Sequence, residues 1–249
     1  MYKLDTFINE NIPFIFNNEI FEYDMKTASF SLVREYNLLD KKIIKNLERM
    51  ISKESRTVEI GKLQNSVPKF KEELSIAFQE ARKLFIEANE LEKENIISIK
   101  KDAIFTNKQC KFQKFGDYIN FRQKHYYTSY INLGRKLEIY YSPNDFSVKG
   151  ISDEKLVFHE EYMNKFLKSF MNKMETDTCP NTVAFTRRFI DKYKRKDLDV
   201  GYYRTFDHRS RFIINDGTEY EMYFNEDIED VDIGYNYFNI LLKIIQIPL

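Results

Sequence analysis

Two aspartates have a sequence context that could form a metal site. Asp24 lies in the segment EYDMKTASFSLV at 22–33, and Asp102 lies in SIKKDAIF at 98–105. Both are expected at the end of a strand, where a sheet can bring two carboxylates together around a hard cation such as Mg²⁺. Two such ions stabilise the attacking and leaving oxygens of a phosphoryl transfer. An aspartate at a strand end also commonly forms a turn or caps a helix, and that alternative stays open.

The segments around these aspartates predict strands and helices that alternate. Residues 12–23 indicate two short strands on either side of an Asn-Asn turn, the second leading into Asp24. A short helix is expected after Asp24 and another over 40–54, and residues 96–107 predict a hairpin that bends around 100–102. Tyrosine-rich alternation over 117–141 predicts further strands, with a turn at Gly134.

The clearest predicted element is a helix that starts near Pro68 and ends before the polar run ELEKEN. Apolar residues recur in it at every third or fourth position, which places them on one face. They are Phe70, Leu74, Ala77, Phe78, Ala81, Leu84, Phe85 and Ala88. We interpret this stripe as core packing.

The pattern changes after Gly150, so we place a domain boundary there, giving regions 1–150 and 151–249. Amphipathic helices are predicted over 153–174 and 180–195, and a closing helix from about Gly234. Short strands are predicted at 200–206, 211–215 and 219–224.

Composition narrows the class of protein. Of the 249 residues, 43% are apolar and 31% are charged, which is typical of a globular chain. No apolar run approaches the length of a membrane span, and Cys110 and Cys179 form no disulfide framework, so we expect a cytoplasmic protein without a membrane partner. Lys plus Arg equals Asp plus Glu at 39 each, so a nucleic-acid binder would have to sort its charges onto separate faces.

Three segments resemble the catalytic motifs of family B DNA polymerases. DMKTASFSLV is similar to D-x-x-S-L-Y-P-S-I, with Asp24 at its first position, and GKLQNSVP at 61–68 is similar to K-x-x-x-N-S-x-Y-G but one residue shorter. IKKDAIF aligns with Y-G-D-T-D-S-I-F so that Asp102 falls on the second aspartate. The order of these segments along the chain is that of the family.

Weaker similarities follow in the same order. QKHYYTSY resembles the K-K-x-Y element that contacts the primer-template backbone, and VKGI resembles the K-G pair that closes the palm. The tail VDIGYNYFNILLKIIQI is similar to the last helix of the thumb.

The resemblance implies an α+β fold: a polymerase-like palm, made of an antiparallel sheet with packed helices, and a smaller, mainly helical thumb-like region. Region 1–150 would be the palm, with a reduced fingers segment at about 40–91, and 151–249 the thumb. The implied function is that of a minimal metal-dependent nucleotidyltransferase without an exonuclease domain, of phage or mobile-element origin. Its partners would be nucleoside triphosphates, a nucleic acid (primer-template or single strand) and a protein that supplies the missing domains.

The same resemblance assigns roles to individual residues. Asp24 and Asp102 would be catalytic and bind Mg²⁺ or Mn²⁺. The nucleotide would contact Ser29, Lys62, Asn65 and Arg82, and the nucleic acid would contact Lys100, Lys101, Lys124, Tyr126 and Lys149.

The chain also departs from the family pattern. Lys100 replaces the first aspartate of the third motif, and Ser29 replaces the tyrosine that screens out ribonucleotides. Lys100 and Lys101 either bind phosphates or neutralise Asp102 and prevent metal binding. Two alternatives therefore remain: an inactive polymerase-derived protein that binds nucleic acid or docks on a replication or transcription complex, and an unrelated α/β interaction protein.

Overall fold

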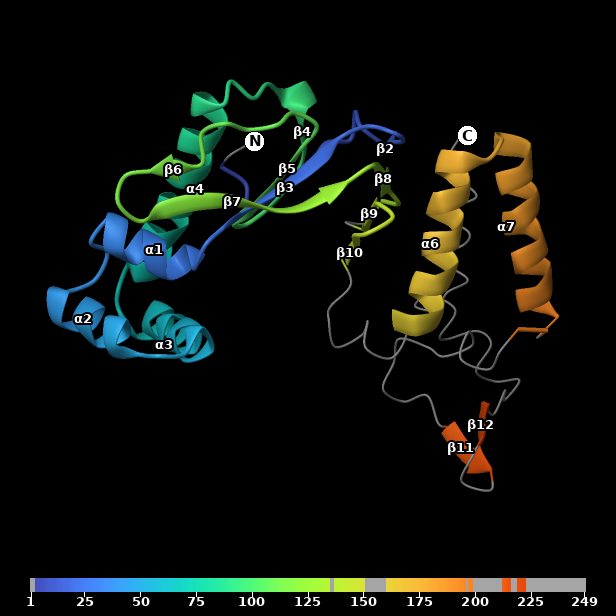
Figure 1. Cartoon of the computed structure of the whole chain (residues 1–249). Coiled ribbons are helices and arrows are strands. Elements are labelled where there is room, and N and C mark those ends of the chain that lie inside the picture. The colour runs from blue at the N-terminus through green and yellow to red at the C-terminus, as the bar shows by residue number, and fades with distance from the viewer. Residues whose placement is uncertain are drawn as a thin grey trace. The chain divides into compact units, whose positions relative to one another are not determined.

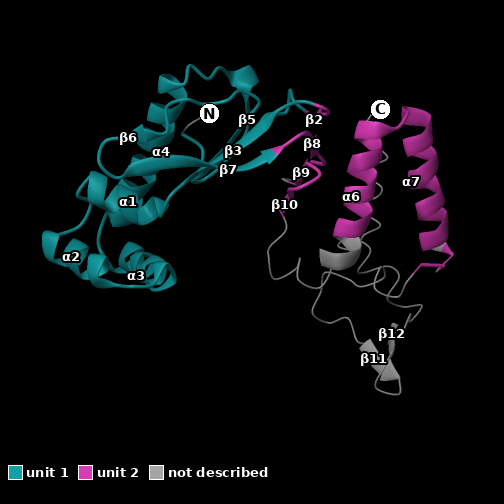
Figure 2. Ribbon diagram, viewed as in Figure 1, with its two compact units in different colours: residues 1–12, 18–126 teal, residues 13–17, 127–249 magenta. Residues whose placement is uncertain are grey.

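The computed structural model describes residues 3–134, 137–150, 160–195 and 197–198, and the strands at 212–215 and 219–222. The chain divides into two compact units, shown in Figure 2. Unit 1 comprises residues 1–12 and 18–126, and unit 2 comprises residues 13–17 and 127–249.

Unit 1 is built on a six-stranded sheet with the order β1-β4-β5-β3-β7-β6. Its strands are β1 (Thr6–Ile8), β3 (Ile20–Met25), β4 (Ile96–Lys100), β5 (Ala103–Thr106), β6 (Lys114–Phe115) and β7 (Ile119–Tyr127). The pairs β1–β4, β4–β5, β3–β5 and β6–β7 are antiparallel. The predicted hairpin at 96–107 is therefore present, as β4 and β5, and β3 is paired with β5.

Unit 1 also contains four α-helices (Figure 1). They are α1 (Ala28–Glu35), α2 (Lys41–Arg49), α3 (Lys53–Ser66) and α4 (Phe70–Ala88), and a single 3₁₀ turn, η1 (Lys93–Asn95), precedes β4. The predicted apolar stripe of α4 is largely buried, and Phe85 packs its ring 5.2 Å from Tyr23 of β3 and 4.5 Å from Phe121 of β7. Burying aromatic rings in this way supplies much of the core energy, so α4 fixes the sheet that carries Asp24.

In the part of unit 2 that the structure describes, a four-stranded sheet with the order β10-β9-β8-β2 is accompanied by the helices α6 and α7 (Figure 1). The elements are β2 (Phe14–Ile15), β8 (Ser129–Asn132), β9 (Glu138–Tyr141), β10 (Phe146–Lys149), α6 (Glu160–Thr176) and α7 (Cys179–Lys194). Sheet residues such as Ile131 and Ile139 share a core with Phe166, Phe170 and Ile190 of the helices. A separate antiparallel pair is formed by β11 (Phe212–Asn215) and β12 (Glu219–Met222).

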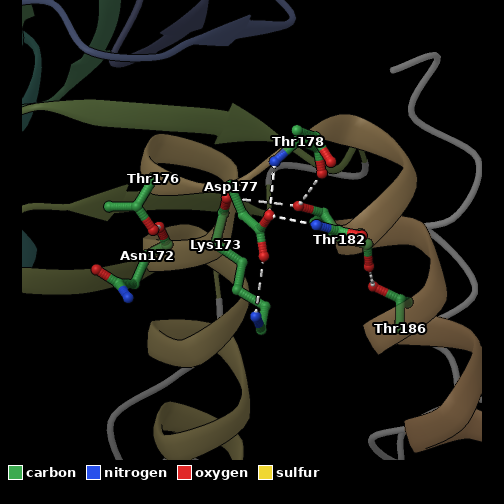
Figure 3. A network of polar contacts seen from close by, with 8 residues as sticks. Asn172, Lys173, Thr176, Asp177, Thr178, Thr182 and Thr186 are labelled. Carbon is green, nitrogen blue, oxygen red and sulfur yellow. Dashed lines mark hydrogen bonds and ion pairs between the residues drawn. The ribbon is translucent and has the colours of Figure 1, made fainter.

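A polar network links the end of α6 to the start of α7 (Figure 3). Asp177 accepts hydrogen bonds from the Thr178 N–H at 2.8 Å and from the Asn181 side chain at 2.7 Å, and its other oxygen lies 3.2 Å from the Lys173 ammonium. These donors lower the pKa of the Asp177 carboxyl, first through Asn181 and then through Thr178 and Lys173. Pro180 stands in the first turn of α7, where its missing N–H costs nothing.

The predicted α+β class is confirmed. The two strands predicted within 12–23 are present as β2, in the sheet of unit 2, and β3, in the sheet of unit 1. The boundary expected near residue 150 falls inside unit 2, because β8 pairs with β2, β9 and β10 extend the same sheet, and this sheet shares a core with α6 and α7.

Several predictions lie outside the described residues. These are the start of the helix predicted over 153–174, the strand at 200–206 and the closing helix from Gly234. Among the helices that the structure does describe, none is both long enough and apolar enough to cross a membrane.

Candidate functional site

Asp24 lies near the end of β3 in the middle of the six-stranded sheet. It is paired with Ala103 of β5, and its side chain is 19% exposed. The neighbours Tyr23 and Met25 are buried, so the strand alternates and directs Asp24 away from the face that they occupy. The sheet thereby holds this carboxylate at a fixed position.

Asp102 is the second residue of the two-residue turn between β4 and β5. The first residue, Lys101, adopts a φ of 51°, which is unusual for a residue other than glycine. The Met25 N–H donates a 3.0 Å hydrogen bond to the carbonyl oxygen of Asp102, extending the β3–β5 ladder by one step. The turn therefore brings Asp102 next to Asp24, as the sequence predicted.

The two carboxylates are close enough to interact electrostatically. Burial raises the pKa of Asp102, and the negative charge of Asp24 raises it further. Lys101 and Lys124 oppose this effect, together with a backbone hydrogen bond. A half-buried acidic pair of this kind favours a proton or a bound cation between its members.

Asp24 and Asp102 open into a pocket with a volume of about 290 Å³. This volume is close to the lower end, about 300 Å³, of the range for small-ligand pockets. Its lining combines both carboxylates with three cationic residues, three hydroxyl residues and an apolar remainder: Asp24, Met25, Thr27, Ala28, Ser29, Phe30, Lys53, Arg56, Thr57, Ile60, Phe78, Lys101 and Asp102.

The basic wall of the pocket comes mainly from the start of α3. Ser52 caps this helix by accepting a hydrogen bond from the Ser55 N–H at 3.2 Å, and Lys53, Arg56 and Thr57 follow in the first turns. The cationic side chains Lys53 and Arg56 make this wall suitable for phosphate, because cations form charge-assisted hydrogen bonds with phosphate oxygens.

Arg56 is the most informative residue of that wall. Its guanidinium carbon lies 4.8 Å from the centroid of the Phe30 ring, in a cation–π contact. Its Nε atom is buried, and it has no hydrogen-bond partner among the described residues. Buried donors are normally paired, so this N–H is a candidate donor to an anion in the pocket.

The hydroxyl side of the pocket follows directly from β3. Thr27 has a φ of 49° and a ψ of 45°, a left-handed conformation that is strained for a β-branched residue. Its hydroxyl lies 3.1 Å from that of Ser31, which itself donates to the carbonyl oxygen of Lys26 at 2.8 Å. These bonds turn the chain sharply after Asp24 and place Ser29 in the pocket lining.

Lys124 of β7 lies beside the acidic pair. Its ammonium nitrogen is 3.9 Å from the Asp24 carboxylate, and its side chain is 42% exposed. The residue predicted to contact nucleic acid therefore forms an ion pair with the residue predicted to bind metal. A bound cation would compete with this ammonium for Asp24.

Four of the predicted site residues thus gather at the pocket: Asp24, Asp102, Ser29 and Lys101. Lys62 and Asn65, predicted to bind nucleotide, do not line it. On α3 the lining residues recur at 53, 56, 57 and 60, and at 100° per residue Lys62 falls on the opposite side of the helix. Lys62 pairs instead with Glu59 at 3.6 Å.

The other predicted contact residues are dispersed. Arg82 is fully buried and donates a 2.7 Å hydrogen bond to the Lys101 carbonyl oxygen, so its guanidinium does not reach the pocket surface. Lys100 lies in the ladder between Thr6 and Ala103. Tyr126 packs edge-on against Phe21 at 5.6 Å, and Lys149 lies in β10 of unit 2.

Lys53, Arg56 and Thr57 were not predicted as site residues, because the sequence pattern predicts a helix over 40–54 and marks no further helix before Pro68. Helix α3 buries only Ile60, so it lacks the apolar stripe by which helices are detected. The signal that could have found it is Ser52, a favourable N-cap directly before Lys53.

The chemistry of this donor set fits a magnesium-type ion. Such ions bind one or two carboxylates and complete their shell with water and substrate phosphates. Within the described residues no group of three or more Asp, Glu, His or Cys side chains converges, so Asp24 and Asp102 would be the carboxylate ligands. The remaining ligands would come from water or from the bound anion.

The fold and site define an α+β protein whose first unit carries an acidic pair opposite a basic wall. A family model described as bacteriophage PBS1 gene 130 protein matches residues 1–249, and the chain belongs to that family. The predicted phage origin agrees with this membership. No curated protein matches the chain. The family description does not refer to DNA polymerases, so the polymerase resemblance stays a prediction.

Proposed function

We propose that this protein is a minimal metal-dependent nucleotidyltransferase, resembling the palm and thumb of a family B DNA polymerase. The observation that carries the proposal is the common pocket of Asp24 and Asp102, with Lys53, Arg56 and Lys101 on its walls. The carboxylates of two different strand ends meet there because β3 pairs with β5. Unit 1 would correspond to the palm, and unit 2 to the thumb-like region.

The two sides of the pocket would perform different tasks. Asp24 and Asp102 would hold one or two Mg²⁺ or Mn²⁺ ions, which supply charge neutralisation for the attacking and leaving oxygens. Lys53, Arg56 and Lys101 would bind the β- and γ-phosphates of a nucleoside triphosphate through charge-assisted hydrogen bonds. A primer 3′-oxygen would then bond to the α-phosphorus, its proton passing to water, and pyrophosphate would leave.

Ser29 lines the same pocket and would face the sugar of the nucleotide. Its side chain is much smaller than the tyrosine that the polymerase resemblance leads one to expect. We therefore expect this protein to accept ribonucleotides as well as deoxyribonucleotides.

The proposal is tested by incorporation of labelled dNTPs and NTPs on a primed template with Mg²⁺ or Mn²⁺. The wild type should extend the primer, and chelation by EDTA should stop it. Asp24→Asn and Asp102→Asn should each abolish extension while the proteins remain folded. Extension that persists in both variants would contradict the proposed role of the acidic pair.

A second function is favoured by one specific contact. The Lys124 ammonium lies 3.9 Å from Asp24, where it partly neutralises the carboxylate. This arrangement suits a polymerase-derived protein that binds nucleic acid or docks on a replication or transcription complex without catalysis. Binding of primed template by folded wild type, with no incorporation under either metal, would favour this function.

A further inference from the structure

Arg82 is a buried cation at the back of the acidic turn. Its side chain has no solvent exposure, and burial lowers its pKa, an effect that Asp5 and Asp102 oppose by their negative charge. One guanidinium nitrogen donates to the Lys101 carbonyl oxygen at 2.7 Å, and another lies 3.4 Å from the Asp5 carboxylate. A buried guanidinium is costly unless such partners compensate it.

The turn that Arg82 contacts is fixed by hydrogen bonds at both backbone polar groups of Lys101. The Lys101 N–H donates to the main-chain oxygen of Asp5 at 2.6 Å, and its carbonyl oxygen accepts from Arg82. The Lys101 ammonium lies 5.1 Å from the ring centroid of Phe78, one helical turn before Arg82 in α4. Both backbone polar groups and the side chain of Lys101 are thus fixed by elements outside the hairpin.

These contacts matter because the turn is strained. Lys101 has a φ of 51°, a strained conformation that a residue with a side chain keeps only where its surroundings enforce it. Asp102 is the next residue, so the direction of its carboxylate depends on this conformation. Asp24 needs no comparable support, since it lies within a paired strand.

We propose that Arg82 is a positioning residue: together with Asp5, it holds the Lys101–Asp102 turn in the conformation that presents Asp102 to Asp24. Its consequence for cation binding rests on the proposed function, whereas its effect on the turn does not. The role differs from simple core stabilisation, because it predicts a local change at Lys101 that other destabilising substitutions do not produce.

The test compares Arg82→Gln, Arg82→Lys and Asp5→Asn in the full chain with Leu47→Ala. Leu47 is a buried residue of α2 in the same hydrophobic core, and it controls for general destabilisation. The readouts are residue-resolved hydrogen exchange of the Lys101 amide and Mn²⁺ affinity, measured from the EPR signal of free Mn²⁺.

Arg82→Gln should accelerate exchange at Lys101 and weaken Mn²⁺ binding about 10- to 100-fold, the range seen when a group that orients a metal ligand is removed. Arg82→Lys and Asp5→Asn should have smaller effects in the same direction, because each retains part of the contact. Leu47→Ala should lower the melting temperature and leave both readouts unchanged.

Two results would overturn the positioning role. One is exchange at Lys101 that is as slow in the Arg82 and Asp5 variants as in Leu47→Ala; the other is weaker Mn²⁺ binding without faster exchange. If Arg82→Gln does not fold, Arg82→Lys and Asp5→Asn decide the question. If the wild type binds no Mn²⁺, the proposed function fails, and the exchange data alone decide on the turn.

Discussion

Met25 and Asp102 are joined by a 3.0 Å hydrogen bond from the Met25 N–H to the Asp102 carbonyl oxygen. This bond fixes the residue after Asp24 to the acidic turn, in continuation of the pairing between Asp24 and Ala103. Two carboxylates separated by 78 positions in the sequence thereby share one pocket, and the charge of one changes the proton affinity of the other.

The first prediction concerns the stability of this acidic pair. Burial and the Asp24 charge raise the pKa of Asp102, so the folded state binds that proton more tightly than the unfolded state. Stability should therefore fall as pH rises through the raised pKa, and Asp102→Asn should remove that loss. We expect the variant to be more stable at pH 7 by about 0.5–2 kcal/mol, the range common for stabilising substitutions.

Urea unfolding of wild type and Asp102→Asn across a pH series checks this prediction. The difference between the two proteins should vanish below the unfolded-state pKa, about 3.9, where Asp102 is protonated in both states. A variant that is less stable than wild type at pH 7 would show that the Asp102 charge is better compensated than the geometry indicates.

The second prediction concerns Lys124, which competes with a cation for Asp24. Lys124→Gln should tighten Mn²⁺ binding by about 2- to 5-fold, the equivalent of a partly exposed ion pair worth up to 1 kcal/mol. Lys111→Gln removes the same charge from an exposed residue outside the pocket lining and should change nothing. Weaker binding in Lys124→Gln would mean that Lys124 supports the site instead.

The third prediction separates the two sides of α3. Arg56→Gln should weaken binding of tripolyphosphate and of dATP with Mg²⁺ about tenfold, since it removes charge-assisted hydrogen bonds from the pocket. Lys62→Gln removes one charge from the opposite side of the same helix and should leave affinity unchanged. Calorimetric titration of the wild type and the two variants measures these affinities. Equal losses of affinity in Arg56→Gln and Lys62→Gln would point to a general charge effect.

The acidic pair was predictable from sequence because each aspartate lies at or beside the end of a strand with strong local signals. β3 and the β4–β5 hairpin are rich in β-branched and aromatic residues, and the resemblance to polymerase motifs selected Asp24 and Asp102 from 39 acidic residues. The apolar stripe of α4 was equally clear from its spacing, and six of its eight residues are buried, all but Leu84 and Ala88.

The basic wall could not be predicted in the same way. Lys53 and Arg56 lie on a helix whose only buried residue is Ile60, so neither periodicity nor motif marks them. The shortened motif at 61–68 instead directed attention to Lys62 and Asn65, which lie off the pocket face of α3. Arg82 was expected to bind the nucleotide because the fingers helix of the resembled family carries such cations. Its burial depends on Asp5, a contact that spans 77 residues.

The fourth prediction concerns the α6–α7 junction in unit 2 (Figure 3). Hydrogen bonds from Asn181, the Thr178 N–H and Lys173 lower the pKa of Asp177, so the folded state favours its charged form. This stabilisation is present above the unfolded-state pKa and is lost as pH falls through the lowered one. Asp177→Ala should therefore lower the melting temperature at pH 7 and have less effect in acid.

Thermal unfolding at several pH values, with Asp191→Ala on the exposed side of α7 as control, tests this expectation. Equal effects of Asp177→Ala at neutral and acid pH would show that the hydrogen bonds of the charged carboxylate do not stabilise the junction.

The most direct test of the central claim is a Mn²⁺ titration of the wild type, Asp24→Asn, Asp102→Asn and the double variant, followed by the EPR signal of free Mn²⁺. If the two carboxylates form one cation site, each single substitution should weaken binding by at least about tenfold, as expected when a charged ligand is removed. The double variant should then bind Mn²⁺ about as weakly as either single variant, because each single substitution already disrupts the same site. Mn²⁺ affinity unchanged in both single variants would contradict the account, because the pocket of Asp24 and Asp102 would then not be where the cation binds.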